Sequence, residues 1–383
     1  MGRLADVTSP LLVRSIDAAT HRTFLREGAA AGRSASFLQT PGWAAVKREW
    51  RAESIGWYAG DRLVGAGLVL YRQLPRLRRF LAYLPEGPVL DWSGELDAWL
   101  EPLAEHLRGQ GAFAIRMGPP VVTRRWSAAQ VKEGIADPTV RRLGQVPPLA
   151  REQTGASVLS QLRETGWRAQ ATEGGFAAGQ PQYNFVIPLD GRDETAVLAG
   201  MNQLWRRNIK KAAKAGVEVT RGGAAQLPAF HELYVHTARR DHFTPRPLAY
   251  FETMFAALDD PAADTEIRLY LAHHEADLVG STLWIRSGRH VWYSYGASST
   301  EKREVRGSNA IQWRMIQDAL ACGAAVYDLR GITETLDADD AHVGLIQFKV
   351  GTGGEAVEYA GEWDLPLNPL LYKGFQLYMN RRG

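Results

Sequence analysis

The stretch Gly344-Leu-Ile-Gln-Phe-Lys-Val-Gly-Thr-Gly-Gly354 lies near the end of the 383-residue chain. Its apolar run, Leu345 to Val350, predicts a short buried strand of a mixed sheet. Lys349 interrupts that run, and neither neighbour is an acid that could pair with it. The glycines that follow allow positive φ angles and a close approach of the backbone.

A cation followed by a glycine-rich turn has two interpretations. Exposed backbone N–H groups beside Lys349 would suit an anion or a developing oxyanion. Alternatively, Lys349 extends its ammonium group to water and the glycines form an ordinary tight turn. The surrounding chain is needed to decide between the two.

Length and composition describe a globular protein with two domains. A chain of 383 residues exceeds one ordinary core. The net charge of +3 is too small to imply nucleic-acid binding by itself. The single cysteine, Cys322, excludes an intramolecular disulfide and suits a reducing compartment. With no signal-peptide pattern and no apolar run longer than Leu63 to Tyr71, we expect a cytoplasmic protein, with peripheral membrane contact left open.

The order of the predicted elements occurs twice. Each half gives a helix, a hairpin of strands, a second helix and a strand, which favours two copies of one α/β unit with mixed sheets. In the first half these are a helix over 34–50, strands at 54–57 and 62–70, a helix over 96–108, a strand at 112–117 and a helix over 158–165. In the second half they are strands at 183–189 and 217–220, helices over 201–215 and 228–240, strands at 267–273, 278–285 and 290–295, a helix over 310–321 and a strand at 325–329.

The domain boundaries follow from that order. The first domain is predicted to span residues 1–180 and to be completed by the segment 360–383, which includes a closing helix over 368–381. The second domain is predicted to span 181–359. The Gly- and Gln-rich stretch 174–182 is expected to connect the two, and the Pro- and Arg-rich segment 118–148 to wrap the first domain.

Two cations stand in positions that favour anion binding. In the helix over 34–50, with Thr40 as N-cap and Pro41 at the first helical position, Lys47 falls on an otherwise apolar face. It binds a ligand or lies at the rim of the core. Arg246 lies in a loop with two prolines, one on either side of it, and Tyr250 follows four residues later. The Arg246 guanidinium group can bind a phosphate or carboxylate through two hydrogen bonds.

Two further stretches are strongly basic. The loop at 72–79 contains four arginines between apolar residues, and it is either a solvated face or a patch for phosphate or anionic lipid. The helix over 201–215 has a broad basic face without an acid at i+4, which indicates a polyanion such as RNA or a lipid head group. Its cations are Arg206, Arg207, Lys210, Lys211 and Lys214.

Several catalytic motifs are absent from the sequence. No P-loop, Gly-x-Gly-x-x-Gly fingerprint, Gly-x-Ser-x-Gly elbow or His-Glu-x-x-His pair occurs. His231 and His236 are five residues apart, which does not place two ligands on one helix face. A metal site and a serine nucleophile are therefore disfavoured.

Taken together, these stretches resemble the FemABX peptidyltransferases, the lipid II:glycine glycyltransferase-like enzymes, most closely an actinobacterial FemX-like branch. The likeness extends from about residue 36 to 363, and its strength lies in the order and spacing of the motifs. The motifs are Gln39-Thr-Pro-Gly-Trp43 through Lys47, WRRNIKKAAKAGV at 205–217, Tyr-Gly-Ala-Ser at 295–298, Gln312-Trp313, Tyr327-Asp-Leu-Arg-Gly331 and Gln347-Phe-Lys349 with Gly351 to Gly354.

The resemblance implies a fold and a reaction. The fold is two tandem GNAT-like (acyl-CoA N-acyltransferase-like) domains, here without the long helical arm that some relatives insert. Such enzymes move an aminoacyl group from aminoacyl-tRNA to the side-chain amine of the third stem-peptide residue of lipid II or a UDP-MurNAc-pentapeptide precursor. Neither a cofactor nor a metal is implied.

The resemblance also implies roles for particular residues. Lys47 and Arg246 correspond to residues that contact the diphosphate of the precursor, and Tyr250 and Tyr295 line the same site, although Tyr293 could replace Tyr295. Phe348 and Lys349 correspond to a pair at which the aminoacyl-tRNA end and the acceptor meet. The basic helix would then contact the tRNA backbone.

One departure from the family pattern concerns the acceptor. Some members carry Asp-Pro after the strand that here ends Arg116-Met-Gly118, and that aspartate helps to hold the acceptor. Gly118 takes its place in this chain. We therefore keep two alternatives to glycine transfer onto lipid II: the same tRNA donor with a small antibiotic or nucleoside precursor as acceptor, and a non-catalytic RNA- or lipid-binding module.

The chemistry of this reaction suggests that Lys349 stabilises an oxyanion. An aminoacyl ester is already activated, and attack of an amine on it creates an oxyanion that Lys349 could stabilise. The amine must also lose a proton, because a lysine-type amine has a pKa of about 10.4. No carboxylate in the motifs is an obvious general base, which leaves substrate-assisted proton transfer open.

Overall fold

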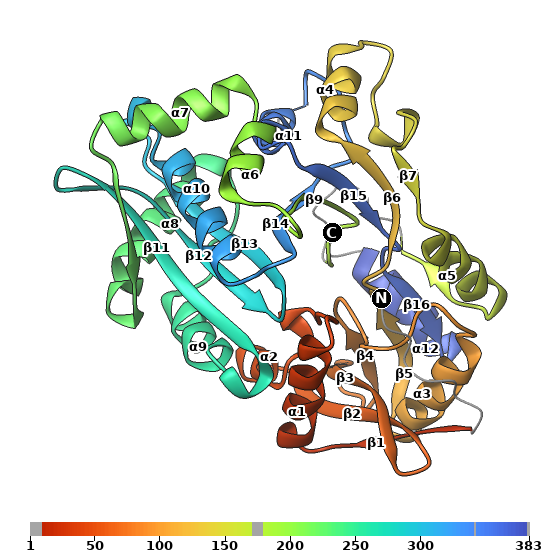
Figure 1. Ribbon diagram of the computed structural model, residues 1–383. Helices are drawn as coiled ribbons and strands as arrows, with labels where there is room; N and C mark the ends of the chain where they lie inside the picture. The colour runs from red at the N-terminus through yellow and green to blue at the C-terminus, as the bar shows by residue number, and fades with distance from the viewer. Residues whose placement is uncertain (1–9, 171–178, 341, 381–383) are drawn as a thin grey trace.

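Two mixed sheets organise the chain (Figure 1). The computed structural model describes residues 10–170, 179–340 and 342–380. Most of the expected connection at 174–182 lies outside these residues, as does the predicted end of the last helix at Arg381. Among the described residues, no helix has both the length and the apolar character needed to cross a membrane.

The strands fall into a seven-stranded and a nine-stranded sheet. The first runs in the order β1 (Leu11–Ser15), β2 (Arg51–Ala59), β3 (Arg62–Gln73), β4 (Phe80–Leu84), β5 (Ala112–Met117), β16 (Trp363–Pro366) and β8 (Arg168–Ala169). The second runs in the order β10 (Glu218–Gly222), β11 (Thr265–His274), β12 (Asp277–Ser287), β13 (His290–Ser298), β14 (Val326–Ile332), β9 (Tyr183–Pro188), β15 (Glu355–Tyr359), β6 (Val122–Ser127) and β7 (Ala150–Arg151).

The helices cover these sheets. The α-helices are α1 (Ala18–Ala30), α2 (Pro41–Val46), α3 (Asp97–Gly109), α4 (Ala128–Ala136), α5 (Gln153–Glu164), α6 (Glu194–Gly200), α7 (Gln203–Lys214), α8 (Leu227–Asp241), α9 (Leu248–Leu258), α10 (Gly307–Ala321), α11 (Val343–Val350) and α12 (Pro369–Asn380). Short 3₁₀ helices are η1 (Phe37–Gln39), η2 (Leu143–Gln145), η3 (Ala224–Gln226), η4 (Pro261–Ala263) and η5 (Arg303–Val305).

The same unit occurs in both sheets. In the first, antiparallel strands β1 to β4 are followed by α3 and by β5, which is parallel to β4. In the second, antiparallel strands β10 to β13 are followed by α10 and by β14, which is parallel to β13. In each unit two α-helices lie between the first two strands. These are α1 and α2 in the first unit, and α8 and α9 in the second. The predicted duplication of an α/β unit is therefore confirmed.

The prediction that the segment 118–148 wraps the first domain is wrong. Its strand β6 pairs with β15, so the segment extends the second sheet. The proline and arginine content concealed a strand in which Thr123 and Trp126 are buried while the arginines between them are half-buried. The chain thus passes from the first sheet to the second and back before residue 170, and it returns to the first sheet again at β16.

The predicted strand at Leu345 to Val350 is a helix, α11. Val343, Ile346 and Val350 are buried at i, i+3 and i+7, which is the spacing of one helix face. A short apolar run does not distinguish a strand from a buried helix by periodicity. The periodic residue that would have indicated a helix, Val343, lies before the run.

The predicted helix over 34–50 is shorter than expected. The 3₁₀ helix η1 comes first, and α2 ends at Val46, so Lys47 is its C-cap. Pro41 stands at the first helical position and Thr40 at the N-cap position, as predicted, but the Thr40 side chain makes no capping hydrogen bond. Its hydroxyl donates instead to the Phe37 carbonyl oxygen at 2.8 Å, back across η1.

Helix α2 joins the two halves by close packing against α9. A Cβ atom on Gly42 would lie 2.2 Å from the carbonyl oxygen of Ala257, so only glycine permits this approach. Apolar side chains of both halves share one buried cluster, among them Phe37 and Trp43 from the first half and Phe251 and Trp292 from the second. This contact holds the end of α2, and with it Lys47, beside α9.

Candidate functional site

A cavity of about 1030 Å³ is lined by residues from both sheets. It brings together five of the six residues predicted for catalysis and substrate binding, which are Lys47, Arg246, Tyr250, Tyr295 and Lys349. They come from the end of α2, the loop before α9, α9 itself, β13 and α11. Because these segments are up to 300 residues apart in the sequence, the fold and not local structure creates the site.

The cavity is lined by cations and by no carboxylate among the described residues. Its cations are Lys47, Arg72, Arg116, Arg246, Arg330 and Lys349. Three of these are in ion pairs, namely Arg116 with Asp364 at 2.7 Å, Arg330 with Glu86 at 2.9 Å and Lys47 with Glu49 at 4.0 Å. The remaining positive charge suits an anionic ligand with more than one charge.

One wall of the cavity is an aromatic and cationic cluster. The Tyr250 and Tyr295 hydroxyls share a hydrogen bond of 3.1 Å. Arg246 lies 5.4 Å and Lys47 5.7 Å from the centre of the Tyr250 ring. Burial, followed by the nearby Arg246 guanidinium, lowers the pKa of Lys47 despite the opposing effect of Glu49. Two cations held this close together repel one another, and a bound anion would relieve that repulsion.

The backbone holds two members of this cluster. His231 Nε2 donates to the Arg246 carbonyl oxygen at 3.0 Å, which ties the loop before α9 to α8. Tyr295 has φ of 52°, a left-handed conformation that is uncommon outside glycine and accumulates at functional sites. Tyr293 lines the cavity too, so both tyrosines considered from the sequence lie at the site.

Lys349 is buried at the base of the cavity, with 3% of its surface exposed. Its Nζ atom donates to the carbonyl oxygens of Gly331 at 2.7 Å and of Arg330 at 3.2 Å. Burial lowers the pKa of Lys349 to about 7, with Asp328 opposing and Arg330 adding to the effect. The interpretation that Lys349 extends to water is therefore wrong, and its amine can be neutral or charged near neutral pH.

Gly351 and Gly353 do not provide free N–H groups for an oxyanion. The N–H groups of Gly351, Thr352 and Gly353 donate to the carbonyls of Gln347, Lys349 and Val350. The glycines serve close packing instead. A Cβ atom on Gly353 would lie 1.9 Å from the Gly200 carbonyl oxygen, and one on Gly354 2.2 Å from the Val186 carbonyl oxygen.

Phe348 does not line the cavity with its neighbour Lys349. Its ring packs on Trp205 of α7 at a centroid distance of 4.8 Å, and its carbonyl oxygen accepts from Trp205 Nε1 at 2.8 Å. Phe348 thus fixes α11 against α7. The geometry gives it a positioning role and not contact with a substrate in the cavity.

The basic residues of α7 lie outside the cavity. Arg207, Lys210, Lys211 and Lys214 are exposed, and no ion pair of these four is found in the described part of the chain. Arg206 is half-buried and donates to the Ala199 carbonyl oxygen at 3.1 Å. Helix α7 begins at the Asn202 cap and contacts the cavity only indirectly, through Trp205 and α11.

Arg330 is a site residue that the sequence did not single out. Its guanidinium pairs with Glu86 of the first half and donates to Gln180 Oε1 at 3.3 Å. Its φ of 64° is left-handed, and its N–H donates to Asp328 at 2.6 Å. Arg330 belongs to the motif Tyr327-Asp-Leu-Arg-Gly331, but that motif indicated no role for this residue. Its carbonyl then orients Lys349, as described above.

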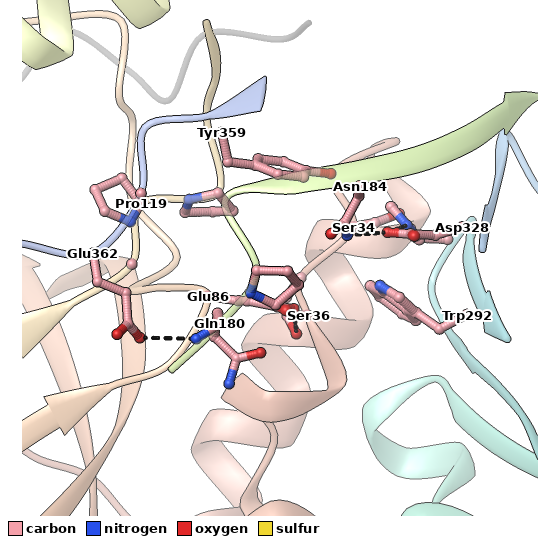
Figure 2. Close-up of a pocket in the computed structure, with 16 residues that line it drawn as sticks. Ser34, Ser36, Glu86, Pro119, Gln180, Asn184, Trp292, Asp328, Tyr359 and Glu362 are labelled. Atoms are coloured by element: carbon pink, nitrogen blue, oxygen red, sulfur yellow. Dashed lines mark hydrogen bonds and ion pairs between the residues drawn. The ribbon is translucent and has the colours of Figure 1, made fainter. Parts of the chain in front are cut away.

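A second, smaller cavity of about 120 Å³ is lined by Glu86, Asp328 and Glu362, among others (Figure 2). Gln180 lines both cavities. Figure 2 shows Glu362 bonded to Gln180 and Asn184 facing Asp328, at distances of 3.3 and 2.9 Å. This chamber is lined by carboxylates without a lysine or arginine, so it does not suit a diphosphate.

Gly118 lines the smaller cavity. A Cβ atom at this position would lie 3.5 Å from the Glu86 nitrogen and 3.6 Å from Glu362 Cγ. The Glu362 side chain and the Glu86 backbone therefore lie next to the position that carries aspartate in some FemABX proteins. No cluster of metal-binding side chains is found in the described ranges.

Comparison with known proteins decides the family. The family model described as FemAB matches residues 16–273 and 264–380. This chain belongs to the FemAB family. A lipid II:glycine glycyltransferase of Staphylococcus saprophyticus is 25% identical over 400 residues, which cover 88% of this chain and 89% of that protein. One from Staphylococcus aureus is 24% identical over 411 residues, with the same coverage.

Solved structures place this FemAB protein among tandem GNAT folds. A crystal structure of FemX superposes with a TM-score of 0.77 at 23% identity, covering 94% of this chain and 98% of that one. A tandem GNAT protein from the clavulanic acid pathway gives a TM-score of 0.52 at 12% identity, covering 94% and 99%. The expected absence of a long helical arm holds for the described residues, where the longest helices, α8 and α10, have 15 residues.

Proposed function

We propose that this protein transfers glycine from glycyl-tRNA to the stem-peptide side-chain amine of lipid II, in the synthesis of peptidoglycan interpeptide bridges. The observation that carries the proposal is a cation-lined cavity with a buried lysine at its base. The names of the Staphylococcus relatives support glycine and lipid II as substrates. The aminoacyl ester supplies the activation, so the reaction requires no cofactor.

The acceptor is bound through its diphosphate. Lys47 and Arg246 act on the phosphate oxygens, with Arg72 across the cavity as a further cation. Tyr250 and Tyr295 position those cations and contact the sugar–phosphate part of the acceptor. This assignment agrees with the absence of carboxylates from the wall, since a carboxylate there would repel the diphosphate.

Lys349 moves the proton. In its neutral form two N–H bonds point to the Gly331 and Arg330 carbonyls, and the lone pair is left for the proton of the acceptor ammonium. The amine then forms a bond to the ester carbonyl carbon, and the new Lys349 ammonium stabilises the oxyanion. When the ester C–O bond breaks, the proton passes to the departing ribose oxygen of the tRNA. The attacking nitrogen also loses its second proton, which goes to solvent, so an ammonium acceptor and the ester give the amide, the free ribose hydroxyl of the tRNA and one proton.

Removal of Arg246 should weaken acceptor binding. The side chain is exposed, so Arg246→Ala should leave the fold unchanged and raise KM for lipid II by about 10- to 100-fold, the effect of losing a charge-assisted phosphate contact. Steady-state kinetics at fixed glycyl-tRNA measure this. Arg62→Ala on the β2–β3 hairpin is the matched control. An unchanged KM would remove Arg246 from the acceptor site.

The basic face of α7 should determine the salt dependence of tRNA binding. Lys210→Glu with Lys211→Glu should lower tRNA affinity and reduce the slope of log affinity against log salt by about two, one for each lost phosphate contact. Filter binding over a range of salt concentrations measures the slope. Lys132→Glu on α4 is the control for net charge. A slope equal to that of the wild type would place the tRNA elsewhere.

A second candidate keeps the tRNA donor and changes the acceptor to a small antibiotic or nucleoside precursor. The observation that favours it is Gly118, with Glu86 and Glu362 in the space beside it. Competition between lipid II and small amines for radiolabelled glycine separates the two. Label on lipid II supports the first proposal, and label only on a small amine supports the second.

The place of action follows from the proposed acceptor. An enzyme that modifies lipid II from glycyl-tRNA works in the cytoplasm, where the tRNA is, and at the inner face of the membrane, where the lipid is. Peripheral contact with that membrane is therefore part of the proposal.

A further inference from the structure

Two neighbouring segments present leucines and cations to solvent beside the large cavity. In the loop between β3 and β4, Leu77 is 47% exposed and lies between Arg76 and Arg78, which are exposed as well. On α12, Leu370 is 83% and Leu377 57% exposed. We call Arg76, Leu77, Arg78, Leu370, Lys373 and Leu377 the Leu–Arg surface.

Hydrogen bonds and packing hold the two segments together. Phe80, at the end of the loop, donates its N–H to the Gly111 carbonyl, and Asn368, at the start of α12, donates to the Phe113 carbonyl. Both segments are thus fixed at the beginning of β5. Leu74 of the loop also packs against the cluster that contains Tyr372 and Phe375 of α12.

The exposed residues of α12 lie on one face of the helix. Leu370, Lys373 and Leu377 follow at i, i+3 and i+7, whereas Tyr372 and Phe375 are buried on the other side. An apolar stripe with a cation in its centre is the pattern of a helix that lies in a membrane interface. Helix α12 is held by the rest of the domain, so it can contact a membrane interface through this exposed face alone.

The charge of the Leu–Arg surface is uncompensated in the described chain. Arg76, Arg78 and Lys373 take part in no ion pair there, and neither the loop nor the described part of α12 contains an acid. Cations without acids between exposed leucines are complementary to anionic head groups over an acyl layer.

We propose that the Leu–Arg surface docks this protein on an anionic lipid bilayer. The cavity wall adjoins both segments, through Arg72 near the end of β3, just before the loop, and through Gln376 and Met379 of α12. Docking therefore places the cavity at the level of the head groups, where the diphosphate of a lipid-linked acceptor lies. The inference rests on the proposed function for the acceptor, but bilayer binding itself requires neither lipid II nor tRNA.

Cosedimentation with vesicles tests the docking. The wild-type protein should bind vesicles of phosphatidylglycerol and phosphatidylcholine and bind pure phosphatidylcholine at least tenfold more weakly. Arg76→Glu with Arg78→Glu should reduce the partition coefficient on the anionic vesicles at least tenfold, since each basic residue near such a surface contributes about 1 kcal/mol. Leu370→Ser with Leu377→Ser should reduce it as well, at any salt concentration.

The matched control carries the same charge change elsewhere. Lys210→Glu with Lys211→Glu on α7 should leave vesicle binding within twofold of the wild type. If the α7 variant loses binding and the Arg76 and Arg78 variant keeps it, the Leu–Arg surface is not the docking site. Equal binding to both kinds of vesicle by all variants would also overturn the proposal.

A turnover measurement separates this inference from the proposed function. The surface variants should lose transfer to lipid II in vesicles and keep transfer to soluble UDP-MurNAc-pentapeptide. Vesicle binding by a protein that transfers glycine to no acceptor would uphold docking and refute the function. Transfer to vesicle lipid II that survives the surface substitutions would uphold the function and refute docking.

Discussion

Replacement of Lys349 by Met should reduce glycine transfer about 10³-fold. The change removes both the proton acceptor and the cation beside the oxyanion, and each is typically worth 10²-fold or more. Methionine has a similar length, so it fills the same buried space. Single-turnover transfer with saturating lipid II and glycyl-tRNA isolates the chemical step. A rate within tenfold of the wild type would remove Lys349 from the mechanism.

The fold of the Lys349→Met variant should persist. The wild type carries a buried amine whose pKa burial lowers to about 7, below its ordinary value. Between about pH 7 and the ordinary lysine pKa, the unfolded chain binds more protons at this position, so the stability of the wild type rises with pH in that window. Methionine abolishes this contribution. The urea midpoint of the variant should therefore depend less on pH from 7 to 10 than that of the wild type.

The pH dependence of the wild-type rate gives a second readout for Lys349. If the neutral amine accepts the proton, the rate should rise as pH increases through about 7 and then level off. The residual rate of Lys349→Met should lack this inflection. A wild-type rate that falls over the same interval would show that only the protonated form of Lys349 is active.

Replacement of Gly353 by Ala should cause the largest loss of stability in the site. The residue has φ of 75°, and a Cβ atom would lie 1.9 Å from the Gly200 carbonyl oxygen and 2.6 Å from its carbon. Both neighbours are backbone atoms at the end of α6, so the contact cannot be relieved by a side-chain movement. We expect a loss of about 3 kcal/mol or more in the free energy of unfolding.

Urea denaturation measures this loss, and Gly344→Ala is the matched control. Gly344 lies at the other end of the same stretch, in α11, where a Cβ atom would meet nothing within 4 Å. Alanine there should be neutral or stabilise the protein by up to about 1 kcal/mol through its helix propensity. Equal midpoints for the two variants would mean that the turn after Lys349 is not packed as described.

Local patterns in the sequence predicted much of the fold. The bounds of β5, Ala112–Met117, agree with the prediction to the residue, and the β2–β3 hairpin lies around its predicted turn. β5 is a mostly apolar run, and the hairpin has a glycine in the short turn between its strands. Helix α11 was mistaken for a strand because only part of its eight residues belonged to the apolar run. The strand β6 was missed because its partner, β15, is more than 200 residues away.

The cavity contains five of the six residues proposed from the sequence for catalysis and substrate binding, but Phe348 lies outside it, Arg330 was not proposed, and the contacts were not predictable. The convergence of Lys47, Arg246, Tyr250, Tyr295 and Lys349 on one cavity agrees with the resemblance to FemABX proteins. The hydrogen bonds of Lys349 to two carbonyls of β14 depend on long-range packing, which no local pattern contains. The same is true of the Arg330–Glu86 pair, whose members are 244 residues apart.

The most direct test of the central claim is transfer of radiolabelled glycine from charged tRNA to lipid II by the purified protein, with alanyl- and seryl-tRNA as parallel donors and Lys349→Met as the control. The account predicts labelled lipid II from glycyl-tRNA, little or no product from the other two donors, and about 10³-fold less product with the variant. Absence of labelled lipid II from all three donors, with a correctly folded wild-type protein, would contradict it.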